Sequence, residues 1–147
     1  MWSAETVFVC ALTLLGRREQ RFPTVEFVER VPAGLSAFVQ AYTRPAERRI
    51  VLVTSTRAFI QARQASARCG ELDAVREIAG VLAHEEWHVF HGPDEQGAYE
   101  AQLIALTYVG AGPTSPLYSQ VAHSMHAVRD ASQRARDGTL MSRRTTP

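Results

Sequence analysis

The sequence predicts an α+β fold, in which several helices pack with a small sheet of about three strands. Apolar residues recur at helical spacing in four segments, and three short runs rich in β-branched residues lie between the first two of these segments. The chain of 147 residues is long enough to bury about two thirds of its unfolded surface in a single core. We therefore expect one domain over residues 1–133 and a polar, disordered tail over residues 134–147.

The first expected element is an apolar helix over residues 4–18, which ends before Phe22-Pro23. It does not match a signal peptide, because Glu5 precedes the apolar run and neither a basic segment nor a small-residue cleavage site accompanies it. The run is also too short to span a bilayer. Cys10 and Cys69 fit no metal-binding spacing, so we expect two reduced thiols in a cytoplasmic protein.

Three strands are expected next, over residues 25–31, 36–43 and 49–56. The first alternates apolar and charged residues before a Pro-Ala-Gly turn, and the second is less regular. The third contains a continuous apolar run, Ile50 to Val53, which is typical of a strand covered on both faces. A short helix or irregular segment is expected over residues 56–68.

A longer helix over residues 71–91 contains the motif His-Glu-x-x-His, formed by His84, Glu85 and His88. Residues four apart face the same way one turn apart, so the two imidazoles can bind one metal ion. Zinc accepts imidazole nitrogens and, in catalytic sites, takes three protein ligands and a water. Glu85 lies about 100° round the helix from His84, where it can reach such a water without being a ligand. Glu86 points into the apolar arc, so we expect it to pair with an arginine.

The motif helix is expected to end at Gly92-Pro93, where the glycine suits a left-handed cap and the proline prevents continuation. A second helix starts at about Asp94 and ends near Gly110. A last helix starts at Ser115 or Pro116 and carries an apolar stripe. The break between the first two helices lets the second fold back across the motif helix.

Two histidines do not complete a catalytic zinc site, so a third ligand is needed. The candidates that follow the motif are His91, Asp94, Glu95 and Glu100. His91 lies about 10.5 Å from His84 along the helix axis and can reach the same ion only if the helix unwinds. Asp94 and Glu95 are explained by their place at a helix start. Glu100 shares a face with apolar residues, where an unpaired carboxylate is unfavourable and coordination to zinc would stabilise it.

Two stretches carry a family resemblance, His84-Glu85-Glu86-Trp87-His88 and, on the next helix, Tyr99-Glu100-Ala101. They resemble the gluzincin branch of zinc metallopeptidases, particularly its smallest members, which pair a His-Glu-x-x-His helix with a glutamate helix. The resemblance covers residues 25–108 and implies a minimal zincin-like domain, with a C-terminal helix after the glutamate helix. It implies zinc ligation by His84, His88 and Glu100, with Glu85 as the general base. The gap from His88 to Glu100 is short compared with the larger family members.

The resemblance implies a zinc-dependent metallopeptidase that acts on a peptide or protein substrate. Zinc would activate a water, and Glu85 would take its proton and pass it to the leaving amine. The alternative is a zinc-binding module of the same fold that regulates or interacts without cleaving. The candidate oxyanion-stabilising residues are Tyr99, Tyr108, Tyr118, His123 and His126. The strand over residues 50–56 either aligns an extended peptide at a sheet edge or is a covered core strand.

The charge pattern gives no indication of a nucleic-acid or membrane partner. The net charge is +1, and acidic and basic residues are interspersed apart from a short Arg-rich end. The chain contains no Lys and no Asn, which is typical of a GC-rich bacterial genome. We expect a peptide or protein partner, while the oligomeric state does not follow from the sequence.

Overall fold

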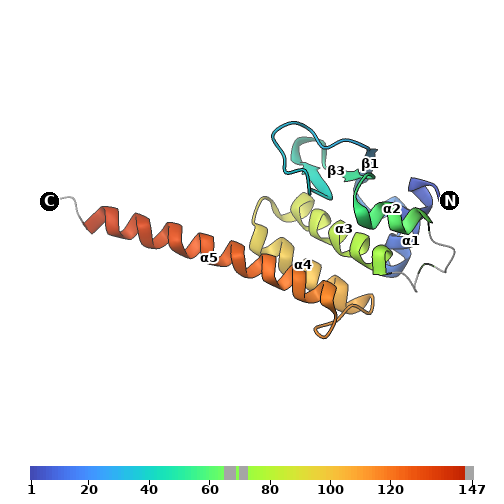
Figure 1. The fold of residues 1–147 in the computed structure, drawn as a ribbon. Coiled ribbons are helices and arrows are strands. Elements are labelled where there is room, and N and C mark those ends of the chain that lie inside the picture. The colour runs from blue at the N-terminus through green and yellow to red at the C-terminus, as the bar shows by residue number, and fades with distance from the viewer. Residues whose placement is uncertain (65–68, 70–72, 145–147) are drawn as a thin grey trace.

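The computed structural model describes residues 1–64, Cys69 and 73–144, and for residues 140–144 it describes the backbone alone. It confirms the predicted α+β class, because the described part of the chain combines five α-helices with a three-stranded sheet (Figure 1). The elements are α1 Ala4–Leu15, β1 Thr24–Val28, β2 Ala41–Arg44, β3 Arg49–Val53, α2 Arg57–Gln64, α3 Asp73–His91, α4 Glu95–Tyr108 and α5 Pro116–Arg144. Two 3-10 helices, Glu19–Arg21 and Pro45–Glu47, lie in the connections.

Helix α1 is shorter than predicted, because Gly16 adopts a left-handed conformation with a φ of 67° and ends it. The side chain of Ser3 caps its start by accepting a hydrogen bond from the backbone N–H of Thr6 at 3.1 Å. The buried face of α1 packs against α2 and α3. Just after α1, Arg17 pairs with Glu86 of α3 at 3.1 Å, which confirms the predicted arginine partner.

The sheet has the strand order β1-β3-β2, with β1 parallel and β2 antiparallel to β3. The residues from Ile50 to Val53 in β3 are buried, as their continuous apolar run predicts. Of the two roles considered for this strand, the covered core strand is confirmed and the sheet edge is wrong, because β1 and β2 flank it on both sides. The edge strand that lies against α3 is β2, which is only four residues long.

Helix α4 folds back against α3, as the Gly92-Pro93 break predicts. Gly92 has a φ of 96°, and its N–H donates to the backbone oxygen of His88 at 3.0 Å. Gly97 of α4 lies so close to Trp87 of α3 that a Cβ at position 97 would overlap the indole ring. The missing side chain therefore sets the close approach of the two helices.

Helix α5 continues to Arg144 and extends beyond the rest of the fold (Figure 1). The prediction of a disordered tail is therefore wrong for residues 134–144, and residues 145–147 lie outside the described residues. The first part of α5 is packed, with Val121 and Met125 buried in a cluster that includes α4. Beyond that cluster, Ala and Arg residues are strong helix formers and continue the helix without a core contact.

A disulfide joins Cys10 of α1 to Cys69, with their Cα atoms 5.4 Å apart. The prediction of two reduced thiols is therefore wrong. The two residues are separated by 59 positions in the sequence, and the packing of α1 against α2 and α3 brings them together. Such a crosslink is unusual in the reducing cytoplasm, where the protein was expected. In the described part of the chain, no helix has both the length and the apolar character needed to cross a membrane.

Candidate metal centre

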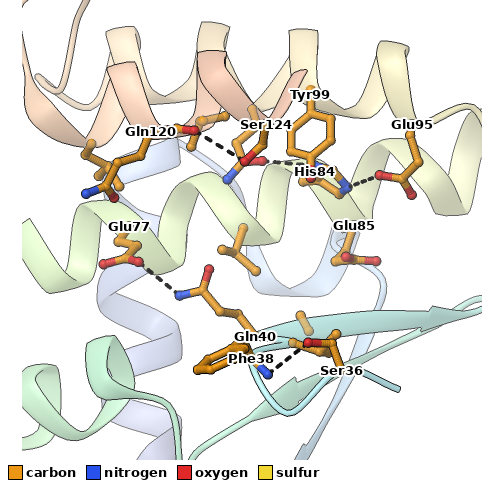
Figure 2. Close-up of a pocket in the computed structure, with 16 residues that line it drawn as sticks. Ser36, Phe38, Gln40, Glu77, His84, Glu85, Glu95, Tyr99, Gln120 and Ser124 are labelled. Atoms are coloured by element: carbon orange, nitrogen blue, oxygen red, sulfur yellow. Dashed lines mark hydrogen bonds and ion pairs between the residues drawn. The ribbon is translucent and has the colours of Figure 1, made fainter. Parts of the chain in front are cut away.

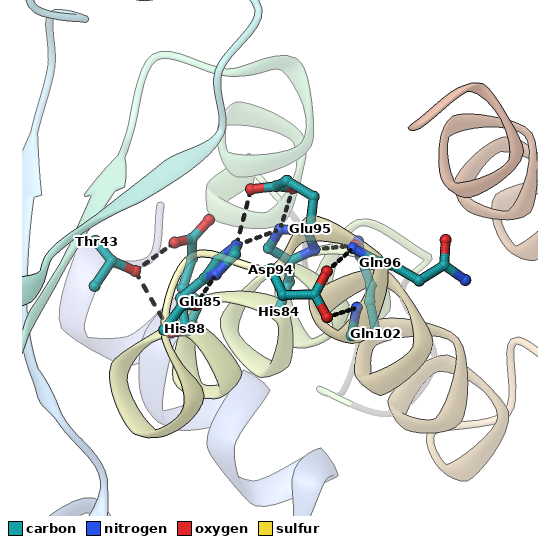
Figure 3. A network of polar contacts seen from close by, with 10 residues as sticks. Thr43, His84, Glu85, His88, Asp94, Glu95, Gln96 and Gln102 are labelled. Atoms are coloured by element: carbon teal, nitrogen blue, oxygen red, sulfur yellow. Dashed lines mark hydrogen bonds and ion pairs between the residues drawn. The ribbon is translucent and has the colours of Figure 1, made fainter. Parts of the chain in front are cut away.

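The two motif histidines of α3 meet at their Nε2 atoms, which lie 3.2 Å apart (Figure 3). This confirms the geometry expected from their i, i+4 spacing on a regular helix. His84 is 9% exposed and the side chain of His88 is 11% exposed, so both imidazoles are largely shielded from solvent. The ring centroids are 4.9 Å apart and the planes are steeply inclined, so the nitrogens and not the ring faces converge.

Glu95 of α4 completes a group of three potential metal ligands with the two histidines. Its carboxylate oxygens lie 3.3 Å from Nε2 of His84 and 3.0 Å from Nε2 of His88. Asp94 caps α4 by accepting hydrogen bonds from two backbone N–H groups of the first turn, so Glu95 begins the helix facing α3. The three ligand atoms all lie within 4.8 Å of one another, and this cluster can bind a metal ion.

Glu100 lies outside this cluster, and the prediction that it faces inward is wrong. It is exposed, and its carboxylate accepts a hydrogen bond from Nε2 of Gln96 at 2.9 Å. Five residues of helix rotate Glu100 by about 140° from Glu95, so the two side chains cannot both face α3. Ile104, one of the apolar residues that share a helix face with Glu100, is 72% exposed. The inward positions of α4 are instead Ala98, Gln102, Leu103, Ala105 and Leu106.

His91, the alternative third ligand, also lies away from the metal-binding cluster. Helix α3 remains helical as far as His91 and does not unwind after His88. The His91 imidazole stacks on Trp87 with ring centroids 4.8 Å apart, and its Nδ1 lies 3.1 Å from the backbone oxygen of Trp87. These contacts keep His91 on the outer surface of α3.

Each motif histidine has a partner for the nitrogen that does not face the cluster. Nδ1 of His84 lies 2.9 Å from Oε1 of Gln102, and Nδ1 of His88 lies 2.8 Å from the backbone oxygen of Gly92. Both partners are acceptors, so each Nδ1 donates and the lone pair of each Nε2 is directed into the cluster. Sequence reasoning did not single out Gln102, although a polar residue among the apolar positions of α4 was a usable signal.

We expect Gln102→Leu to lower the affinity for a divalent metal by about 10- to 100-fold, the usual effect of losing such a partner. Leucine cannot accept the Nδ1–H of His84, so the ring loses its fixed tautomer and orientation. Titration of Zn²⁺ against a competing chelator at fixed pH measures this. Gln102→Glu keeps an acceptor and should retain affinity, and Gln133→Leu on the exposed part of α5 is the control. An unchanged affinity for Gln102→Leu would contradict this role.

Glu85 lies next to the cluster without belonging to it, as its position on the flank of the helix predicts. It is 8% exposed, and its Oε2 accepts a hydrogen bond from the hydroxyl of Thr43 at 2.6 Å. Thr43 belongs to the edge strand β2, so the sheet orients this carboxylate from the side opposite α4. This hydrogen bond holds the Glu85 carboxylate beside the cluster, and Glu85 is not one of the three potential ligands.

A cleft passes the cluster on the side of β2, and it contains two cavities that share Ala41, Glu85 and Glu95. The first has a volume of about 470 Å³ and extends between α3 and α5 toward Glu77; we call it the Glu77 chamber (Figure 2). The second has a volume of about 430 Å³ and extends toward Tyr42 and the turn between α3 and α4. The cluster therefore lies where the two cavities meet.

Tyr99 is the candidate oxyanion-stabilising residue that the structure brings to the site. It lines the Glu77 chamber, and its ring lies edge-on to His84 with centroids 4.7 Å apart. Burial, followed by the charges of Glu95 and Glu85, raises the pKa of the Tyr99 hydroxyl, so this hydroxyl is a hydrogen-bond donor at neutral pH. The other candidates lie elsewhere: Tyr108, His123 and His126 are exposed, and Tyr118 packs in the cluster between α4 and α5.

Searches of family models, curated proteins and solved structures give no match to this chain. The functional interpretation therefore rests on the geometry of the cluster and of the cleft around it.

Proposed function

We propose that this chain is a zinc-dependent metallopeptidase that hydrolyses peptide bonds. The observation that carries the proposal is the convergence of His84, His88 and Glu95 on one point beside Glu85, which lines the same two cavities. The donor types, the shielding of the histidines and the adjoining cleft are each requirements of a hydrolytic metal site.

The donor set favours zinc. Two imidazoles and one carboxylate are a ligand set of catalytic zinc sites, whereas magnesium and calcium prefer oxygen ligands alone. Two nitrogens bound to a tetrahedral ion at about 2.0–2.1 Å lie roughly 3.3 Å apart. The separation of 3.2 Å between the Nε2 atoms of His84 and His88 agrees with this value, so binding requires little movement of α3.

The residues around the cluster supply the remaining parts of the reaction. When bound, zinc polarises the substrate carbonyl and lowers the pKa of a coordinated water. Glu85 would accept a proton from the attacking water and pass it to the leaving amine, while the Thr43 hydroxyl holds its carboxylate in place. Tyr99, protonated at neutral pH, can donate a hydrogen bond to the oxygen on which negative charge develops.

Strand β2 gives the cleft a means of aligning a peptide. It is an edge strand of the sheet, and Ala41, Tyr42 and Thr43 line the cavities on both sides of the cluster. A peptide in extended conformation that pairs with this edge by main-chain hydrogen bonds would cross the cluster. This role was one of the two alternatives for the strand that proves to be β3, and in the proposal the neighbouring strand β2 has it instead.

The test compares zinc-loaded wild type with Glu85→Gln on a denatured proteome, with sequencing of the new peptide termini. Glutamine keeps the shape of the side chain but cannot take a proton, so we expect full zinc binding and a loss of cleavage of about 100- to 10,000-fold. Glu86→Gln is a matched control, because Glu86 is the next residue of α3 and pairs with Arg17 on the opposite side. Equal cleavage by wild type and Glu85→Gln would reject catalysis by Glu85. No cleavage by any of them would favour a module that binds zinc without turnover.

A further inference from the structure

The Glu77 chamber has an acidic lining. Three of its lining residues are carboxylates, Glu77, Glu85 and Glu95, and no Arg among the described residues lines it. A bound zinc and its water would offset the charges of Glu85 and Glu95, which lie at the end of the chamber next to the cluster. Glu77 lies at the other end, seven residues or about 10.5 Å before His84 along α3. The chamber therefore keeps one uncompensated negative charge at a distance from the metal centre.

Glu77 has no cationic partner in the part of the chain that the structure describes. Its carboxylate accepts a hydrogen bond from Nε2 of Gln40 at 3.0 Å, and no ion pair joins it to an Arg or His of these residues. Arg57 and Glu77 both line an adjoining cavity, and no ion pair joins them. A half-buried carboxylate with only a neutral partner is able to accept a further hydrogen bond from a cation in the chamber.

Gln102 provides an independent indication that the chamber receives a peptide. Its side chain is 7% exposed and lines the chamber, and its Oε1 is engaged with His84. Its amide nitrogen makes no hydrogen bond to an acceptor among the described residues, and this atom keeps some exposure. An amide N–H that lines a cavity and has no acceptor of its own is a donor for a carbonyl oxygen, which every peptide bond of a substrate offers.

The rim of the chamber is suited to a long side chain. Phe38 lines the chamber from the loop before β2 and is 91% exposed, so its ring is available to a ligand (Figure 2). An aromatic face attracts guanidinium and ammonium groups and also covers aliphatic stems. Tyr42, Pro45 and Pro93 line the second cavity, which has no acidic residue other than the shared Glu85 and Glu95. Of the two cavities, the Glu77 chamber is therefore the one that can prefer a cationic side chain of a ligand.

We propose that the Glu77 chamber binds an arginine or lysine side chain of the substrate, adjacent to the peptide bond that is cleaved. The inference rests on the proposed peptidase function and names its substrate class. The cationic head reaches Glu77 and Gln40, the stem lies near Phe38, and Gln102 donates to a main-chain carbonyl.

The test uses two peptides that differ only by arginine or citrulline, its neutral isostere, at the position next to the cut. The cut sites of wild type on a denatured proteome define the rest of the peptide sequence. We expect wild type to prefer arginine by about 10- to 100-fold in kcat/KM, the usual effect of one charge-assisted hydrogen bond. Glu77→Gln should lose this preference, so that its kcat/KM values for the two peptides become similar. Glu86→Gln should behave as wild type.

A binding measurement separates a failure of this inference from a failure of the peptidase proposal. Calorimetry with the zinc-loaded Glu85→Gln protein measures the affinities of peptides from a random library that contain either arginine or citrulline. The same measurement is then made on the protein that also carries Glu77→Gln. Cleavage without an arginine or lysine preference, or with a preference that Glu77→Gln leaves intact, would overturn the inference and leave the peptidase standing. Absence of cleavage combined with arginine binding that depends on Glu77 would support the chamber and reject the peptidase. If neither cleavage nor arginine binding that depends on Glu77 is found, the peptidase proposal and the chamber proposal are both rejected.

Discussion

Replacing either motif histidine with alanine is expected to lower zinc affinity by far more than 100-fold, beyond the roughly 10- to 100-fold effect of losing a supporting hydrogen bond. His84 and His88 each direct Nε2 at the proposed ion, so each variant loses a ligand outright. Competition with a chelator at fixed pH measures the affinities. Zinc should also raise the unfolding temperature of wild type and leave that of the two variants unchanged, because only a ligand that binds the folded state stabilises it.

His91→Ala is the matched control for the histidine variants. It removes the same side chain from the same helix, one turn beyond His88, where it stacks on Trp87 and does not face the cluster. We expect its zinc affinity to stay within about twofold of wild type. A loss at His91 as large as the loss at His84 would mean that the end of α3 rearranges around the ion.

The second large effect distinguishes the two glutamates of α4. Glu95→Ala is expected to weaken zinc binding by at least about 100-fold, because it removes the one carboxylate that contacts both motif histidines. Glu100→Ala should change the affinity by less than about twofold, since Glu100 is exposed and bonds only to Gln96 among the described residues. The same chelator competition measures both variants. A greater loss at Glu100 would restore the ligand set that the family resemblance implied.

The motif helix and its cap were predictable because their signals are local. The i, i+4 spacing of His84 and His88 fixes their common direction on any regular helix. Gly92 followed by Pro93 ends the helix for reasons of backbone geometry that do not depend on the rest of the chain. The same reasoning placed Glu85 on the flank of the site, and the structure agrees.

The third ligand was not predictable in this way, because it depends on how α4 is rotated about its axis. Glu95 and Glu100 differ by about 140° on that helix, and the packing of α4 on α3, with Gly97 against Trp87 and Leu106 against Gly80, decides which of them faces α3. The position of Glu95 in the first turn also explained its negative charge, because a carboxylate there interacts favourably with the helix dipole, so no metal was needed to account for it. A residue can complement the helix dipole and bind a metal ion at the same time.

The disulfide and the extent of α5 were missed for different physical reasons. Sequence spacing carries no information on whether Cys10 and Cys69 meet, since their contact depends on the packing of three helices. The segment over residues 134–144 was interpreted as disordered from its polar composition, but its Ala and Arg residues favour a helix that the buried part of α5 has already nucleated.

Anomalous X-ray diffraction at the zinc edge, on crystals of the zinc-loaded protein, tests the metal centre most directly. We predict a single strong peak at about 2.0–2.2 Å from Nε2 of His84, Nε2 of His88 and a carboxylate oxygen of Glu95. Glu85 should lie near the peak without binding it. The absence of a peak between the histidines, or a peak bound by Glu100 or His91 in place of Glu95, would contradict the proposed centre.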